Sequence, residues 1–487
     1  MGLLTACGLF LLYSVQLAAS SPPFYGKSAL GHTSPARGWN SFVAQSNSNG
    51  LSVGYVDSQC SFFYNNVQPG YDYICSFDSG WSVSCNGDDN GRILADPGVF
   101  STMSIQDFAE KLHSNGMKLG IYMIPGAFTS DANKTVEGTN ITIGSLFNTT
   151  VDGRTGINNN YNCRNDFIYS LDGVQQWHDS VVKQFVLWGV DFVKLDYITP
   201  GSSLGDNDGD SKPANDSGAV VAMHSAITRL APGMRLDISW ALDRQEPFFD
   251  IWKHDADTLR VDQDINAGNN PVVWAVLQRT LEMYRQFITL TIDPSPMMIR
   301  PDMDSLVVAT NTTASNWSAF STIERYSQLT LWLGAGANLI LGSDLTKVDA
   351  LGRMLTTHPE VLDAAGFTAN WPMVPKLNSG APSQLQAWIA GPNSAGTGAE
   401  AVVVLSNLGP DLGQGAFGTQ LNGTQGVGAT LAQLGIGSGK WSVRRVLGGG
   451  NGKTDFTNLG TVNGPAGVVN ASLVEHETVL LKLTKVA

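Results

Sequence analysis

The sequence is poor in basic residues and in long hydrophobic runs. Its 487 residues include 29 Lys and Arg against 42 Asp and Glu, a formal net charge of −13. Such an acidic balance argues against a nucleic-acid partner or an anionic membrane surface. Charged residues make up only 15% of the chain and form no long block. The composition therefore fits a globular protein that acts on neutral substrates, and the length suggests two domains.

Cysteine and histidine are also scarce, and neither is arranged to hold a metal. None of the five Cys residues has Cys-x-x-Cys spacing, and the His residues form no His-Glu-x-x-His run. The acidic segment Asp206–Asp210 resembles the start of a calcium loop. However, Ser211 and Ser217 stand where that loop needs glycine and glutamate. We therefore assign no metal site.

One apolar run, residues 3–17, stands at the N-terminus, and it is short for a membrane span. It leads into the small residues 18–20, as in a secretory signal peptide with its cleavage site. We expect residues 1–20 to be removed and the protein to be secreted, extracellular and free of the membrane. Four cysteines then remain, which allow two disulfides in three connectivities: Cys60, Cys75, Cys85 and Cys163.

Eight Asn-x-Ser/Thr sequons fit a secreted glycoprotein. They begin at Asn133, Asn140, Asn148, Asn215, Asn311, Asn316, Asn422 and Asn470.

Strand-like and helical patterns alternate over the first two thirds of the chain. Two helical stripes are clear, one from Ile105 to Leu112 and one from Val174 to Trp188, each followed by a glycine stop. Eight alternating units predict a (β/α)8 TIM barrel over residues 24–365. The eight strand-like runs are 38–42, 73–78, 118–124, 190–196, 235–240, 258–264, 296–300 and 337–342.

After about residue 365 the helical stripes end, and Gly, Ser, Asn and Thr separate short β-rich runs. These runs predict a C-terminal antiparallel β-sandwich over residues 366–487. The clearest are 386–390, 401–405, 441–446 and 478–483.

Two aspartates at the ends of strand-like runs indicate the chemistry. Asp196 shares a strand face with Lys194, and Asp264 is expected to share one with Arg260 and Asp262. A retaining glycosidase needs two carboxyl groups, a nucleophile and an acid/base, roughly 5–5.5 Å apart. We predict Asp196 as the nucleophile, kept ionised by Lys194. We predict Asp264 as the acid/base, with a pKa raised by Asp262 and Asp196.

Five ordered motifs resemble those of glycoside hydrolase family 27, the α-galactosidases. They are Gly38–Phe42, Trp188–Asp196, Arg260–Ile265, Pro301–Met303 and Leu341–Leu345. The resemblance implies a barrel followed by a β-sandwich, a two-step retaining mechanism, no cofactor, and an oligosaccharide or polysaccharide substrate.

The resemblance also assigns substrate-binding roles. Lys194 and Arg260 would hold sugar hydroxyls, Tyr122 would line the pocket, and Asp78 would bind the far side of the ring. Ser79, Ser239 and Trp240 complete the predicted pocket. Trp39, Trp81 and Trp240 are candidates to stack on a sugar face.

Several positions depart from the α-galactosidase pattern. Asp78-Ser79 stands where the family has Asp-Asp, gripping O4 and O6 of galactose, and Ser239-Trp240 replaces a Cys-Glu-Trp sequence. The segments 135–142 and 161–163 are similar to the family's isomalto-dextranase-like branch. Terminal α-D-galactosyl hydrolysis is the first prediction. The alternatives are α-1,6-glucan hydrolysis, β-L-arabinopyranosidase activity, and a carbohydrate-binding pseudoenzyme.

Overall fold

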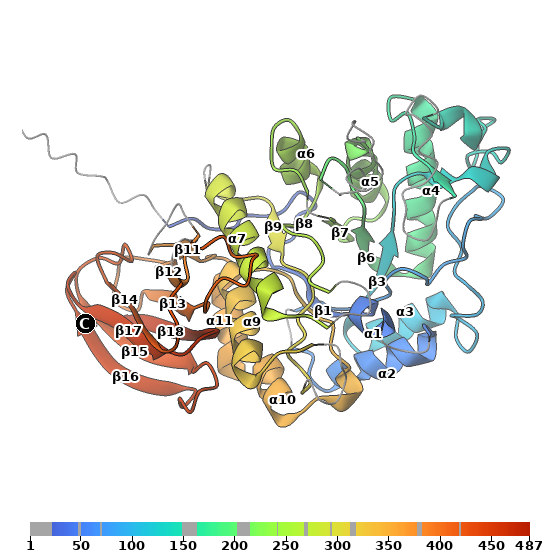
Figure 1. The fold of residues 1–487 in the computed structure, drawn as a ribbon. Helices are drawn as coiled ribbons and strands as arrows, with labels where there is room; N and C mark the ends of the chain where they lie inside the picture. The colour runs from blue at the N-terminus through green and yellow to red at the C-terminus, as the bar shows by residue number, and fades with distance from the viewer. Residues whose placement is uncertain are drawn as a thin grey trace, which may run out of the picture.

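The structure is a computed structural model in which two bodies lie side by side (Figure 1). The predicted signal peptide, the calcium-like loop and the sequon at Asn316 lie outside the described residues. The structure describes residues 22–46, 50–68, 71–148, 163–201, 215–240, 242–266, 271–292, 295–311, 318–376, 382–417 and 420–487.

Eight parallel strands form the first body, in the order β10-β1-β2-β3-β6-β7-β8-β9. A parallel bridge between Leu306 and Leu341 links the segment after β9 to β10, which confirms the predicted TIM barrel. Each predicted run contains or adjoins one strand. The strands are β1 (Arg37–Asn40), β2 (Tyr73–Ser76), β3 (Met117–Met123), β6 (Val190–Leu195), β7 (Arg235–Ile238), β8 (Thr258–Arg260), β9 (Arg300–Asp302) and β10 (Leu339–Leu341).

Helices cover the outside of the sheet, and their ends follow the predicted signals. The Ser104 hydroxyl caps α3 by accepting from Asp107 N at 3.1 Å, and α4 stops at Gly189 in the left-handed region. The helices are α1 (Phe42–Ser46), α2 (Val53–Tyr64), α3 (Ile105–Ser114), α4 (Asp172–Trp188), α5 (Ser217–Leu230), α6 (Phe248–Asp255), α7 (Trp274–Thr291), α9 (Thr322–Ala335), α10 (Ala350–Thr357) and α11 (Pro359–Thr368).

Short elements fill the connections around these helices. The pair β4 (Ala127–Phe128) and β5 (Arg164–Asn165) is antiparallel and extends the segment that follows β3. Three 3₁₀ turns are η1 (Thr129–Asp131), η2 (Ile143–Leu146) and η3 (Leu345–Lys347).

Strand alternation divides the barrel interior into an apolar and a polar layer. Toward the strand N-termini, Ala36, Ile74, Phe192 and Ile340 form a separate hydrophobic cluster. Two residues beyond Ile74 and Phe192, and further along the other strands, the inward side chains are polar or charged. They are Asn40, Ser76, Lys194, Asp237, Arg260 and Asp302. The charged layer thus lies toward the C-terminal ends of the strands, where barrel enzymes carry their active sites.

The second body is the predicted antiparallel β-sandwich. A six-stranded sheet, β11-β12-β13-β18-β15-β16, is accompanied by the pair β14-β17. The eight strands are β11 (Val374–Pro375), β12 (Leu385–Ala390), β13 (Glu400–Asn407), β14 (Gln425–Thr430), β15 (Lys440–Leu447), β16 (Thr457–Asn463), β17 (Val468–Leu473) and β18 (Glu477–Val486).

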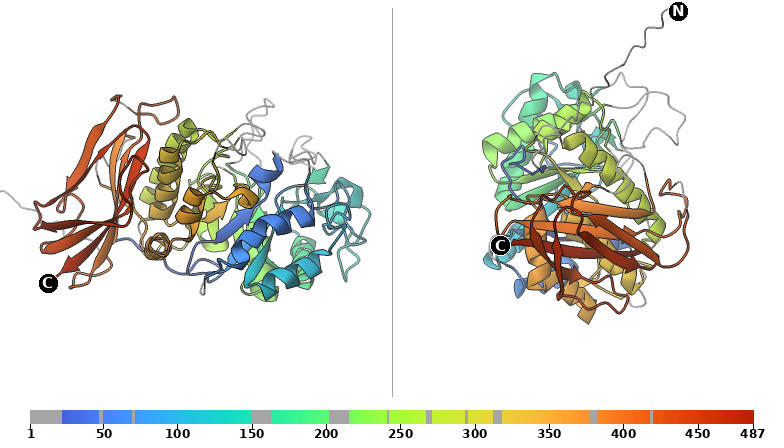
Figure 2. Two further views of the ribbon diagram at one scale, coloured as in Figure 1. Left: turned by 90° about the horizontal axis from the view of Figure 1, so that it is seen from below. Right: turned by 90° about the vertical axis from the view of Figure 1, so that its left-hand side faces the viewer.

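The sandwich packs against the barrel helices α7, α9 and α11, as Figure 2 shows. Trp274 Nε1 on α7 donates to Leu408 O at 2.8 Å, and Arg444 on β15 pairs with Glu360 on α11. His476 Nδ1 lies 2.7 Å from Glu324 Oε1 on α9. These contacts join the two bodies on the barrel's flank.

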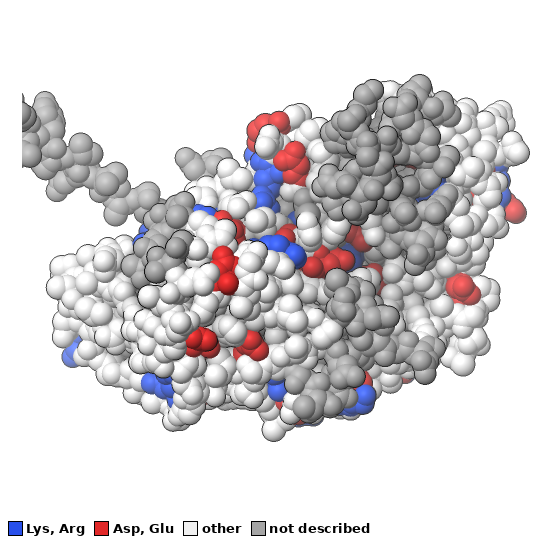
Figure 3. Space-filling model, in the orientation of Figure 1, with Lys and Arg blue, Asp and Glu red and all other residues white. Residues whose placement is uncertain are grey.

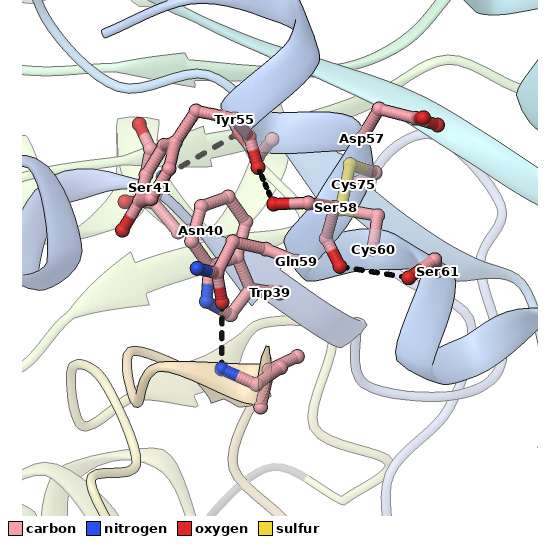
Figure 4. Close-up of a disulfide and its surroundings, with 12 residues drawn as sticks. Trp39, Asn40, Ser41, Tyr55, Asp57, Ser58, Gln59, Cys60, Ser61 and Cys75 are labelled. Carbon is pink, nitrogen blue, oxygen red and sulfur yellow. Dashed lines mark hydrogen bonds between the residues drawn. A yellow bond between two sulfur atoms is a disulfide. The ribbon is translucent and has the colours of Figure 1, made fainter. Parts of the chain in front are cut away.

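Two disulfides connect Cys60 to Cys75 and Cys85 to Cys163. The first joins α2 to β2, the strand that leads to Asp78, and lies near Trp39 (Figure 4). Of the helices that the structure describes, none is long and apolar enough to span a membrane.

Replacing both Cys60 and Cys75 with Ala should lower the free energy of unfolding by about 3 kcal/mol, since the disulfide closes a loop of about 15 residues. The measurement is the urea unfolding midpoint of the double variant against wild type. An unchanged midpoint would contradict a stabilising role for this bond.

Candidate active site

An ion pair forms one side of the polar layer. Lys194 Nζ on β6 lies 2.9 Å from Asp78 Oδ2, just beyond β2, and both side chains are nearly inaccessible. Ser41 Oγ accepts from Asp78 N at 2.8 Å, which fixes the backbone there. The Lys194 ammonium also lies 5.5 Å from the ring centre of Tyr122. The hydrogen-bonded partner of Lys194 is therefore Asp78, and its ammonium interacts with Asp196 through charge alone.

Asp196 follows β6 directly and is held by the neighbouring strands. Its backbone N–H donates to Met123 O of β3 at 2.8 Å, and the Ser239 hydroxyl after β7 donates to Asp196 Oδ1 at 2.5 Å. The side chain is buried. Two predicted site residues, Asp196 and Ser239, are thus brought into contact, with one Asp196 carboxylate oxygen fixed by a donor.

Arg260 lies at the end of β8 among three carboxylates. Its Nη1 is 3.0 Å from Asp264 Oδ1 and 2.8 Å from Asp304 Oδ2. Its Nε is 3.3 Å from Asp302 Oδ2. Arg260 is 3% exposed, so its charge depends on these partners.

The sequence motif around Pro301 includes Asp302, but no site role was predicted for Asp302 or for Asp304. Asp302 ends β9, and Asp304 follows two residues later. This Asp-x-Asp pattern at a strand end is the signal in the sequence that marks them.

Asp264 has a pKa raised to about 7. Loss of hydration among the surrounding side chains is the largest cause, and the negative charges of Asp304 and Asp196 add to it. Arg260 and Lys194 oppose the shift. The side chain keeps 37% of its surface exposed, so a substrate can reach it. A carboxyl with this pKa can donate a proton near neutral pH and take it back later.

The expected role of Asp262 is wrong. β8 ends at Arg260, so Asp262 no longer follows the strand alternation. Its carboxylate turns to α7, where Arg279 Nε lies 2.8 Å away and the Thr280 hydroxyl also donates at 2.8 Å. The sequence predicted that the charge of Asp262 raises the pKa of Asp264. In the structure, Asp304 from the segment after β9 has this effect.

Of the three candidate stacking tryptophans, two are packing residues. Trp39 and Trp81 are fully buried, and their Nε1 atoms donate to Ser343 O at 2.9 Å and to Tyr122 O at 2.8 Å. Trp240 is only partly buried and lies with its ring 6.2 Å from that of Tyr197. Of the three rings, only that of Trp240 therefore keeps an accessible surface.

Ser79 is half-buried beside Asp78. Its carbonyl accepts from Gln45 Nε2 at 2.8 Å, and its hydroxyl oxygen lies 3.5 Å from the same nitrogen. Gln45 belongs to α1, the short helix after β1. A neutral amide thus accompanies the hydroxyl at the position where the sequence pattern has lost a carboxylate.

The polar layer encloses about 430 Å³, its open mouth included, between Asn40, Phe42, Lys194, Arg260 and Asp304 among others. Acidic and basic atoms lie side by side around a hollow near the middle of the face in Figure 3. Within the described ranges, no group of three or more His, Cys, Asp or Glu side chains could hold a metal ion.

Comparisons with known proteins identify the family of the chain. A family model described as alpha galactosidase A matches residues 57–158. Alpha-galactosidase 3 of Hypocrea jecorina is 39% identical over 481 residues, which cover 94% of this chain and 72% of that protein.

Solved structures share the fold over most of the chain. A family 27 β-L-arabinopyranosidase from Geobacillus stearothermophilus, in complex with arabinose, has a TM-score of 0.74 at 18% identity, covering 93% of this chain and 98% of that one. An α-galactosidase from Saccharomyces cerevisiae, with raffinose, has a TM-score of 0.63 at 14% identity, covering 94% and 100%.

The raised pKa of Asp264 makes a prediction about stability. A carboxyl with a pKa of about 7 in the folded state and about 3.9 unfolded stabilises the fold most below pH 4, and this contribution is lost as pH rises to 7. Asp264→Asn lacks the titration. The melting temperature of the variant minus that of wild type should therefore increase from pH 4 to pH 8.

Melting curves at several pH values measure this difference. Glu110→Gln, an exposed carboxyl on α3, is the control and should show a nearly constant difference. A difference for Asp264→Asn that stays flat or falls with pH would contradict the raised pKa.

Proposed function

Since the chain belongs to glycoside hydrolase family 27, the α-galactosidase family, we propose that it is a secreted, retaining α-galactosidase that removes terminal α-D-galactosyl residues. As a member of that family, it is a glycosidase that hydrolyses O-glycosyl bonds and acts on galactosides. The observation that carries the finer proposal is Asp264, whose pKa of about 7 is raised in part by the negative charge of Asp196. Two carboxyl groups with different proton affinities are what a double displacement needs.

In the first step, the Asp196 carboxylate attacks the anomeric carbon while Asp264 gives its proton to the departing glycosidic oxygen. The C–O bond breaks, and a covalent glycosyl-Asp196 ester remains. The Ser239 hydroxyl, which donates to Asp196 Oδ1, orients the attacking carboxylate. We assign to Arg260 and Lys194 the binding of sugar hydroxyls.

In the second step, Asp264 is ionised and accepts a proton from an incoming water molecule. That oxygen attacks the anomeric carbon, the ester bond to Asp196 breaks, and the sugar leaves with its original configuration. Both carboxyl groups return to their starting states. The pKa of about 7 suits a group that must act as acid and then as base.

Sugar choice depends on the Asp78 side of the pocket. Asp78 remains, bonded to Lys194, but Ser79 offers a hydroxyl where a second carboxylate would grip the galactose O4 and O6. A site that hydrogen-bonds a substrate hydroxyl strongly rejects a sugar that lacks that hydroxyl. β-L-Arabinopyranosidase activity is the second candidate, because arabinopyranose keeps the galactose ring and lacks C6, so it has no O6 to bind at Ser79.

Secretion is part of the proposal. It is supported by the N-terminal apolar run, the sequons and the two disulfides, since such bonds persist in oxidising compartments. We assign catalysis to residues 24–365, and residues 366–487 form the accompanying sandwich domain.

A panel of nitrophenyl glycosides tests the proposal, with isomalto-oligosaccharides and dextran alongside. We expect release from the α-galactoside and a loss of at least about 10³-fold in kcat for Asp196→Asn, since the amide is no nucleophile. Isomaltose release from dextran with an untouched α-galactoside would move the enzyme to the glucan branch. Preference for the β-L-arabinopyranoside would make the second candidate the function.

The Asp196→Asn variant also separates enzyme from binding protein. A carbohydrate-binding pseudoenzyme would bind sugar equally well in both forms and turn over none. If Asp196→Asn kept wild-type activity, the assignment of the nucleophile would be wrong.

A further inference from the structure

The carboxylate of Asp304 connects the acid/base segment to the arginine of the site. Its Oδ2 accepts two hydrogen bonds, from Arg260 Nη1 at 2.8 Å and from the backbone N–H of Ile265 at 2.9 Å. Arg260 is the hydrogen-bond partner of Asp264, and Ile265 directly follows Asp264 in the chain. One Asp304 oxygen therefore holds both residues. Asp304 is 6% exposed, and its position is therefore set by protein contacts.

The backbone of Asp304 is itself firmly held. Its N–H donates to Asp302 Oδ1 at 2.7 Å, and its carbonyl accepts from Trp332 Nε1 of α9 at 2.8 Å. The φ angle is +71°, a left-handed conformation that is uncommon outside glycine and that Asp tolerates better than most residues. The second side-chain oxygen, Oδ1, accepts from Ser305 N. This side chain has little freedom to move.

We propose that Asp304 is a positioning residue of the hydrolytic reaction, which holds Arg260 and the Asp264–Ile265 segment in the one arrangement that lets Asp264 act as the proton donor. The inference rests on the proposed function, since it gives Asp264 the acid/base role. Asp304 acts through Arg260 and Ile265.

The charges around Asp264 explain how Asp304 exerts this control. Arg260 on β8 and Lys194 on β6 favour the ionised carboxylate, while Asp304 and Asp196 favour the protonated form. The Tyr197 side chain also interacts with Asp264. Asp304 shares the Arg260 Nη1 atom with Asp264. Removing its charge would therefore take away a repulsion and leave Arg260 more available to Asp264. Both changes lower the pKa of Asp264.

The pH dependence of kcat/KM for Asp304→Asn tests the proposal. The substrate is the methyl glycoside of the sugar that the panel identifies, because its leaving group needs a proton. We expect the alkaline limb of the profile to shift to lower pH by about 1 unit or more, because the pKa of Asp264 falls. The nitrophenyl glycoside, which leaves without a proton, should show a smaller change. Asp304→Ser is a second variant with the same expected direction, should the amide variant fail to fold.

Asp262→Asn is the matched control. Asp262 lies two residues from Asp264 in sequence and is buried like Asp304, but its carboxylate faces Arg279. The alkaline limb of the Asp262→Asn profile should therefore stay in place. Asp304→Glu, which keeps the charge, should keep an alkaline limb near that of wild type.

An activity loss of equal size at every pH, with no moved limb, would overturn the positioning role. Carboxyl-selective ¹³C NMR measures the pH midpoint of the Asp264 titration in the absence of substrate. The Asp264→Asn variant assigns the signal. An inactive wild type would overturn the proposed function. A midpoint that is the same in wild type and Asp304→Asn would overturn the inference.

Discussion

Charge pairing inside the barrel is the constraint on which the site depends. Arg260 and Lys194 are buried cations, and each is stable there only because carboxylates surround it. The carboxyl groups outnumber these two cations, and protonation relieves the excess. Burial, with the charge of Asp302, holds the pKa of Asp237 well above its usual range, and Asp264 retains its proton up to about pH 7. Asp264 is thus a solvent-accessible carboxyl group in a layer that holds more carboxyl groups than cations.

The barrel supplies the geometry for this layer. Inward positions recur every second residue, so Lys194 extends the face begun by Phe192, and Asp302 extends that of Arg300. Asp196 and Asp304 follow just beyond the ends of these two strands. Parallel strands end at one rim, which brings residues more than 100 positions apart in sequence into contact. Outside the strands, the Cys60–Cys75 disulfide joins β2 to α2. The helices α7, α9 and α11 lie between the barrel strands and the sandwich.

Much of this arrangement could be predicted from sequence, because strands such as β2, β3 and β6 carry apolar residues and helices such as α3 begin at a clear capping signal. The sandwich was harder: β14 and β16 are rich in Gly, Asn and Thr and resemble loops until their pairing is known. In the site, Asp196 and Ser239 meet as parts of one pocket. Asp262 was misjudged, because nothing in its sequence shows that β8 ends at Arg260. Asp304 was missed for the converse reason, since its partners Arg260 and Ile265 are distant in sequence and become neighbours only when the barrel closes.

The central claim is that Asp196 forms a covalent bond to the sugar while Asp264 manages the proton. An activated 2-deoxy-2-fluoro glycoside, which slows release of the intermediate more than its formation, tests this directly when the labelled enzyme is digested and its peptides are weighed. We predict one added sugar on the peptide that contains Asp196, with Asp264 unmodified. A label on another carboxylate, or an unlabelled enzyme that releases product of inverted configuration, would contradict the account.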